Sequence, residues 1–223
     1  MARRKERLEK LASNYTGFRE VVLDVTDRKA VTDFFGTLSA DVGNIDLLVN
    51  NAGVALDAKV FDEMDWQDIQ HMVDTNVLGT AHFSWSYLRT TRQQSTRYII
   101  NIGSIAGNYA YPNNNIYGAS KAFVNHLSKN LRSDYVTGNT RITSIEPGLA
   151  RTEFSEVRFK GNVQKEQDLY ANTSYIKAED IASIVSYLIS LPVHVNINQI
   201  EVMPNTQAWG PLSVTRGQRL KHN

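Results

Sequence analysis

Short apolar runs alternate along the chain with longer stretches of helical spacing. Each run is too short for a helix and is bounded by polar residues, glycine or proline, which indicates a buried strand. Strands separated by helices favour right-handed crossovers, so the fold class is α/β, a doubly wound parallel sheet with helices on both faces. The predicted strands are Val21 to Val25, Leu47 to Asn50, Tyr98 to Ile102, Ile142 to Ile145 and Ile200 to Met203.

Apolar residues three and four positions apart predict the helices between these strands. Asp65 is placed to cap the first of them, and a third helix runs from about Ala178 to Ser190 and is stopped by Pro192. The residues that mark the first two helices are Trp66, Ile69, Val73, Val77 and Ala81, and then Ile116, Ala119, Phe123, Leu127 and Leu131.

Composition narrows the class of protein. A chain of 223 residues with 42% hydrophobic content fits one domain, and a net charge of +1 gives no reason to expect a nucleic acid or a membrane surface as partner. Cysteine is absent, which removes thiolate chemistry, and we expect no metal site. No apolar run approaches the roughly 20 residues that span a bilayer, so we expect a cytoplasmic protein that acts on small molecules. The tail from Gln207 onward is polar with a basic end, which fits a frayed terminus at least as well as a functional one.

A phenol and an ammonium group lie four residues apart at Tyr117 and Lys121. On a helix this spacing places both on one face, and a nearby cation favours the phenolate and would bring its pKa of about 10 toward neutrality. The pair therefore predicts proton transfer. The same spacing also occurs by chance, as an exposed tyrosine and a solvated lysine.

Two further segments end predicted strands at the edge where open parallel sheets bind ligands. Ser104 follows one strand and could polarise a carbonyl, whereas its surroundings lack the Gly-x-Ser-x-Gly pattern of a serine hydrolase. Asn51 to Gly53 follows another strand, where a simple turn is the alternative interpretation.

Taken together, these segments resemble the classical short-chain dehydrogenase/reductase family, over nearly the whole chain. In detail the chain is most similar to the NADP-dependent 3-hydroxy acid dehydrogenases, including those that act on serine and allo-threonine. The resemblance implies a Rossmann-like fold, one domain over residues 1–223, and a homodimer or homotetramer. The motifs that carry it are Asn51-Ala-Gly53, Asp74-Thr-Asn76, Ser104, Tyr117-x-x-x-Lys121 and Pro147-Gly148, with Glu146-Pro-Gly-Leu149 and Thr152-Glu-Phe154 among the finer cues.

The resemblance also implies a role for each matching residue. Tyr117 would exchange a proton with the substrate oxygen, which Ser104 would hold. Lys121 would bind the nicotinamide ribose and lower the pKa of the tyrosine, and Asn76 would support a water in the proton relay. The residues that would line the cofactor groove are Asp24, Val25, Asn51, Gly53, Pro147, Gly148 and Thr152.

Three arginines are candidates for selecting the cofactor and the substrate. Arg3 and Arg4 stand where this subfamily has an arginine pair that binds the 2′-phosphate of NADP, although a basic helix start is the alternative. Arg158 is a candidate for the carboxylate of a hydroxy acid because a guanidinium binds carboxylates with two hydrogen bonds, and an arginine on a surface lid is the alternative.

The chain departs from the family at its start. Dinucleotide-binding folds open with a strand, a glycine-rich turn and a helix, and none of the thirteen glycines here forms a Gly-x-Gly. The missing strands would lie between the segments Val21 to Val25 and Leu47 to Asn50. We therefore expect an N-terminally incomplete domain in which these two segments do not pair.

Two functions follow from these observations. The first is an oxidoreductase that transfers a hydride between NADP(H) and a small 3-hydroxy acid or a related carbonyl compound. The alternative is a catalytically silent, truncated homologue that joins full-length relatives through the helices around Trp66 to Leu88 and Ile116 to Tyr135.

Overall fold

The computed structural model describes residues 1–41 and 44–210, and within them the chain forms a four-stranded parallel sheet. The strands lie in the order β1-β2-β3-β4, so neighbours along the chain are neighbours in the sheet. Four of the five predicted strands are confirmed. They are β1 (Leu47–Asn50), β2 (Arg97–Ile102), β3 (Thr140–Pro147) and β4 (Gln199–Val202).

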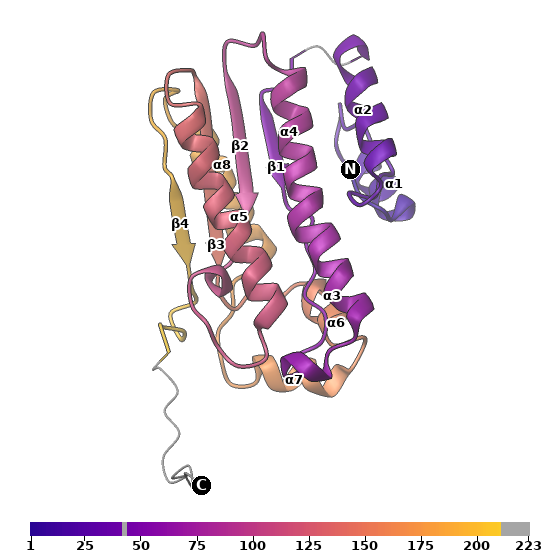
Figure 1. The fold of residues 1–223 in the computed structure, drawn as a ribbon, viewed down its shortest axis with the longest axis vertical. Helices are drawn as coiled ribbons and strands as arrows, with labels where there is room; N and C mark the ends of the chain where they lie inside the picture. The colour runs from indigo at the N-terminus through magenta and orange to yellow at the C-terminus, as the bar shows by residue number, and fades with distance from the viewer. Residues whose placement is uncertain (42–43, 211–223) are drawn as a thin grey trace, which may run out of the picture.

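Helices cover both faces of this sheet (Figure 1). On one face, α4 (Thr80–Thr90) and α5 (Asn115–Asp134) cover a core that includes Ile99 and Ile142. On the other face, α8 (Ala178–Ser190) places Leu188 against Ile100 and Ile145. Because both faces of the sheet are buried, its strands appear in the sequence as continuous apolar runs and not as an alternation of apolar and polar residues.

The predicted helix that begins after Asp65 is confirmed, together with its cap. Asp65 Oδ1 accepts the backbone N–H of Gln67 at 2.8 Å. The helix is divided into α3 (Trp66–Met72), the π-helical turn η2 (Val73–Gly79) and α4. The remaining elements are α1 (Lys5–Asn14), α2 (Arg28–Asp41), η1 (Phe61–Glu63), η3 (Ile105–Gly107), α6 (Glu153–Arg158) and α7 (Val163–Tyr170).

The prediction of a strand over Val21 to Val25 is wrong. Only Val22 forms a bridge, which is parallel and joins it to Ala2. Within the described residues this segment makes no ladder with β1, as expected, and a cavity of about 530 Å³ lined by both segments lies there. The segment stays irregular because its backbone groups have a sheet partner at one position only.

In the part of the chain that the structure describes, no helix is long and apolar enough to cross a membrane. The basic end of the tail, residues 211–223, lies outside the described residues.

Candidate active site

Ser104 and Tyr117 lie where two cavities meet at the carboxyl end of the sheet. One cavity, of about 620 Å³, and the other, of about 1010 Å³, are both lined by these two residues. Ser104 follows β2 and caps η3, since its Oγ accepts the N–H of Ala106 at 3.1 Å. Its hydroxyl also hydrogen-bonds the phenol of Tyr117 in the first turn of α5. A small molecule that reached both hydroxyls would therefore have room on either side.

Lys121 lies one helical turn after Tyr117 and is buried, with 5% of its surface exposed. Its Nζ donates to the carbonyl of Ile102 at 2.7 Å and lies 5.9 Å from the centroid of the Tyr117 ring. Burial lowers the pKa of Lys121 to about 8. The ammonium group is therefore held at the end of β2, with hydrogen-bonding capacity left for a ligand.

Tyr117 does not have the lowered pKa that the sequence suggested. Burial raises its pKa to about 12, against the opposing effect of the hydrogen bond from Ser104. Lys121 faces the ring from a distance and is not among the causes of the shift. The phenol is therefore protonated at neutral pH, and the protonated phenol is the form that donates a proton.

Asn76 lies in the π-helical turn η2 and is almost fully buried. Its Oδ1 accepts the N–H of Val54 at 2.8 Å, while its Nδ2 donates to the carbonyl of Val54 and to Ser120 Oγ. Both amide hydrogens are thus used, so the side chain could support a water only as an acceptor. A π-helical turn is frequent at functional sites because it reorients one side chain of a helix.

Gly53 leaves a narrow space between two of these groups. A Cβ atom there would lie 3.3 Å from Lys121 Nζ and 3.4 Å from Asn76 Oδ1. Asn51 and Gly53 line the smaller cavity together with Thr152, which caps α6 by accepting the N–H of Phe154. Pro147 and Gly148 line the same cavity, so the structure brings five of the seven predicted groove residues together there.

Arg3 and Arg4 also line this smaller cavity. Each faces a carboxylate: Arg3 Nη1 is 3.8 Å from Asp24 Oδ2, and Arg4 Nη2 is 2.6 Å from Glu153 Oε2. Arg7 pairs with the same Glu153 carboxylate. Asp24 and Val25 line the neighbouring cavity beside β1, so they extend the same groove.

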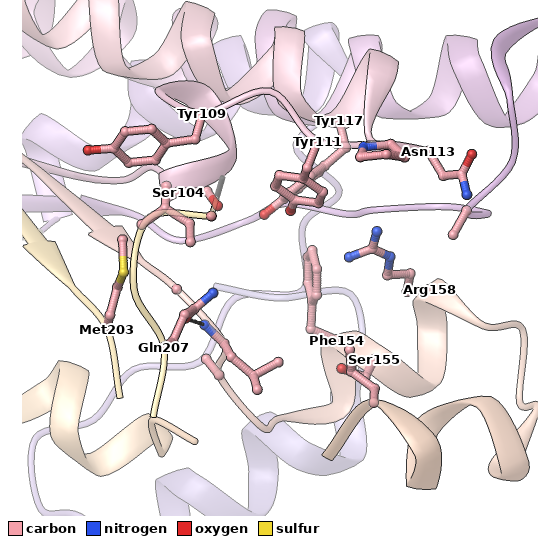
Figure 2. A pocket seen from close by; sticks show the side chains of 18 of the residues that line it. Ser104, Tyr109, Tyr111, Asn113, Tyr117, Phe154, Ser155, Arg158, Met203 and Gln207 are labelled. Carbon is pink, nitrogen blue, oxygen red and sulfur yellow. Dashed lines mark hydrogen bonds between the residues drawn. The ribbon is translucent and has the colours of Figure 1, made fainter. Parts of the chain in front are cut away.

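Arg158 projects into the larger cavity from the end of α6 (Figure 2). It hydrogen-bonds Tyr111, and its own Nε has no partner among the described residues. Figure 2 also shows Phe154 beneath Tyr117, with ring centroids 5.7 Å apart. The Nε–H of Arg158, which lies near the rings of Tyr111 and Phe154 in Figure 2, suits an anionic group of a small ligand.

Sequence reasoning missed three residues of these cavities. Tyr111 lies in a loop with no periodic pattern, and Gln207 accepts the N–H of Leu149 at 2.7 Å from a distant segment. Glu153 belongs to the motif Thr152-Glu-Phe154 but was given no role of its own, because its pairing with Arg4 joins positions 149 residues apart. None of these contacts leaves a signal in one sequence.

The smaller cavity fits part of a dinucleotide. Lys121 and the space at Gly53 suit a ribose, and the arginines that line the same cavity suit a phosphate. The glycine-rich turn that usually holds the pyrophosphate has no counterpart, since the sequence contains no Gly-x-Gly. No cluster of potential metal ligands occurs among the described residues.

Known proteins are similar to this chain in sequence and in fold. The chain is 42% identical over 216 residues to an NADP-dependent 3-hydroxy acid dehydrogenase of Shigella flexneri, covering 96% of this chain and 87% of the relative. It is 40% identical over 218 residues to sulfoacetaldehyde reductase 2 of Chromohalobacter salexigens, covering 96% and 86%.

A solved structure of a serine dehydrogenase in a closed form with NADP⁺ superposes with a TM-score of 0.91 at 41% identity, covering 97% of this chain and 88% of that one. The family model described as short chain dehydrogenase matches residues 1–162. From its fold, its site and these matches, the chain belongs to the short-chain dehydrogenase family.

Proposed function

We propose that this protein is an NADP-dependent oxidoreductase that interconverts a small 3-hydroxy acid and the corresponding carbonyl compound. The observation that carries this proposal is the position of Ser104 and Tyr117 between two cavities. One cavity is lined by arginines that suit a phosphate, and the other by an arginine that suits a small acid. A hydride acceptor and a hydride donor could thus meet at one pair of hydroxyls.

The proton is handled by Tyr117 in this proposal. In the reducing direction its phenol donates the proton to the carbonyl oxygen, and in the oxidising direction its phenolate accepts the proton of the alcohol. Ser104 holds that oxygen by a hydrogen bond. Asn76 keeps Val54 in place and supports a water as an acceptor, next to Lys121.

The nicotinamide ring supplies or accepts the hydride when the cofactor is bound. Lys121 would hold its ribose hydroxyls, and the added negative charge and hydrogen bonds would favour the ammonium form of the lysine. Arg3 and Arg4 would bind the 2′-phosphate in exchange for Asp24 and Glu153. The walls of this cofactor site would be formed by the other predicted residues that line the smaller cavity, which are Asn51, Gly53, Pro147, Gly148 and Thr152.

Arg158 would bind the acid group of the substrate. The two relatives are named for a 3-hydroxy acid and for sulfoacetaldehyde, and both compounds carry an anionic group close to the reacting carbon. Arg158 and Tyr111 offer N–H and O–H donors to such a group in the larger cavity. An uncharged alcohol would offer the guanidinium no negative charge, so it would gain less from these donors than an acid does.

We also propose that the protein forms a homodimer or homotetramer through α4 and α5. A groove on these helices is lined by Trp85, Leu88 and Leu131 among others, and Trp85 has 52% of its surface exposed. Sedimentation equilibrium would show a monomer if this assignment is wrong.

The experiment that tests the proposed function is a titration of this chain with NADPH followed by fluorescence, and an assay of 3-hydroxybutanoate oxidation followed by nicotinamide absorbance. Binding together with turnover would support the oxidoreductase. Folded protein with neither would favour the silent homologue, which needs only the helix surfaces.

Tyr117→Phe should abolish turnover, because the variant loses only the hydroxyl that transfers the proton. The pocket keeps its ring, so melting temperature and NADPH affinity should stay near those of the parent protein. Tyr15→Phe is a matched control, since Tyr15 is exposed and is not among the residues that line either cavity. Turnover by the Tyr117 variant at the parent rate would contradict the assigned role.

A further inference from the structure

A buried carboxylate that the proposed chemistry does not use lies beneath the segment that carries Ser104. Glu146 is in β3, immediately before Pro147, and its side chain has no exposed surface. Burial raises the pKa of its carboxyl, against the effect of its hydrogen bonds. A buried acid is expensive for a fold, so its contacts should show what it contributes.

The segment from Gly103 to Gly107 is packed tightly onto side chains below it. A Cβ at Gly103 would overlap Asn125 Oδ1 and lie 3.2 Å from Glu146 Cγ. A Cβ at Gly107 would lie 2.6 Å from Asn125 Nδ2. The two glycines on either side of Ser104 are thus seated on Asn125, and the first of them also on Glu146.

Hydrogen bonds join the same groups into a chain that ends at Ser104. Asn125 Nδ2 donates to the carbonyl of Ser104 at 3.3 Å and to Asn108 Oδ1 at 3.1 Å. Asn108 Nδ2 then donates to Glu146 Oε2 at 2.6 Å. Glu146 therefore fixes the orientation of the Asn108 amide, which in turn fixes that of Asn125.

One oxygen of Glu146 receives both side-chain amides. Oε2 also accepts Gln199 Nε2 at 2.6 Å, and the Ser144 hydroxyl adds a further hydrogen bond to the carboxylate. A second carboxylate, Glu201, accepts the same Asn108 amide at 3.3 Å from a partly exposed position. The shorter bond and the buried position make Glu146 the principal anchor.

We infer that Glu146 is a positioning residue that holds the Ser104 hydroxyl in place through Asn108 and Asn125. The catalytic part of this inference rests on the role proposed above for Ser104. The structural part, the ordering of residues 103–109, stands independently of it. This positioning requires an acceptor oxygen at Glu146 Oε2 and does not require the negative charge of the carboxylate.

Three variants separate the acceptor from the charge. Glu146→Gln keeps an oxygen that can accept both amides, Glu146→Leu removes the acceptor, and Glu201→Gln is the matched control on the partly exposed carboxylate. Asn108→Ala removes the next link at an exposed position, so it tests the same chain if the leucine variant does not fold.

Hydrogen exchange of the peptide 103–109, read by mass spectrometry, is the first measurement. Glu146→Leu and Asn108→Ala should speed its exchange, while Glu146→Gln and Glu201→Gln should leave it near the parent rate. In steady-state kinetics Glu146→Leu and Asn108→Ala should lower kcat about ten- to a hundredfold with an unchanged KM for NADPH, because misplacing a reacting group affects the chemical step.

Parent-like exchange and kcat in Glu146→Leu or Asn108→Ala would overturn the inference. So would a Glu146→Gln variant as impaired as the leucine variant, since the charge would then be what matters. If the parent chain shows no turnover, the proposed function fails. The exchange data still decide whether Glu146 orders the segment.

Discussion

The most consequential residues are two ionisable groups whose pKa values shift in opposite directions. Burial lowers the pKa of Lys121 to about 8 and raises that of Tyr117 to about 12. Each shift favours the neutral form, so desolvation dominates over attraction between the groups. Proximity of Tyr117 and Lys121 in the sequence predicted the reverse for the tyrosine, because spacing carries no information on burial.

Lys121→Met should stabilise the protein at pH 7. Below about pH 8 the native and unfolded states both bind the proton, so the native state bears the full burial penalty, roughly 3 kcal/mol for a shift from 10.5. Between about pH 8 and 10.5 only the unfolded state keeps the proton, and the stability of the parent protein rises with pH. The lost bond to Ile102 offsets about 1 kcal/mol.

Urea unfolding at pH 7 and at pH 10 checks this expectation, with the exposed Lys10→Met as control. The advantage of the Lys121 variant should shrink at the higher pH. An advantage that is absent at pH 7, or one that grows with pH, would show that burial does not control this group.

At the scale of elements, the close contact between α5 and the end of β2 depends on glycines. Gly103 has no room for a Cβ, since its neighbours Asn125 and Ser144 occupy that space. Gly36, in the exposed interior of α2, has nothing within 4 Å of its Cβ position. The same substitution should therefore have opposite effects at the two positions.

Gly103→Ala should destabilise the protein by about 1–3 kcal/mol, because an added methyl group overpacks a close contact. Gly36→Ala should stabilise it by about 1 kcal/mol, because alanine has the higher helix propensity. Free energies of unfolding in urea measure both. A Gly103 variant as stable as the Gly36 variant would mean that α5 can move away from the strand end.

Helix positions were the most predictable elements. Asp65 was identified as a cap from its residue type and place, and the structure confirms the bond to Gln67. The π-helical turn η2 was not predicted, because its apolar spacing is that of an ordinary helix. Val21 to Val25 failed as a strand because β-propensity is realised only where a neighbouring strand supplies hydrogen bonds.

For the whole molecule, the groove beside the sheet is the feature that a cofactor should stabilise. NADPH at 100 times its dissociation constant should add about 2.7 kcal/mol to the stability, and NADH should add less because it lacks the 2′-phosphate. Thermal unfolding with each nucleotide measures this difference.

Arg4→Ser should narrow the difference between the two nucleotides, and Arg28→Ser is a control that lines neither cavity. Equal shifts from NADPH and NADH in the parent protein would contradict the assignment of the arginines to the phosphate.

The sequence by itself determined the fold class, the four strands of the sheet, three helical segments and the family, because these depend on local periodicity and on motifs of fixed spacing. It also identified Ser104, Tyr117 and Lys121 as a set. Only the tertiary structure decided what lies between distant segments: the two cavities that meet at Tyr117, the pairing of Arg4 with Glu153, and the buried contacts of Glu146. Burial and pairing across the chain arise from packing in three dimensions, and a linear pattern does not encode them residue by residue.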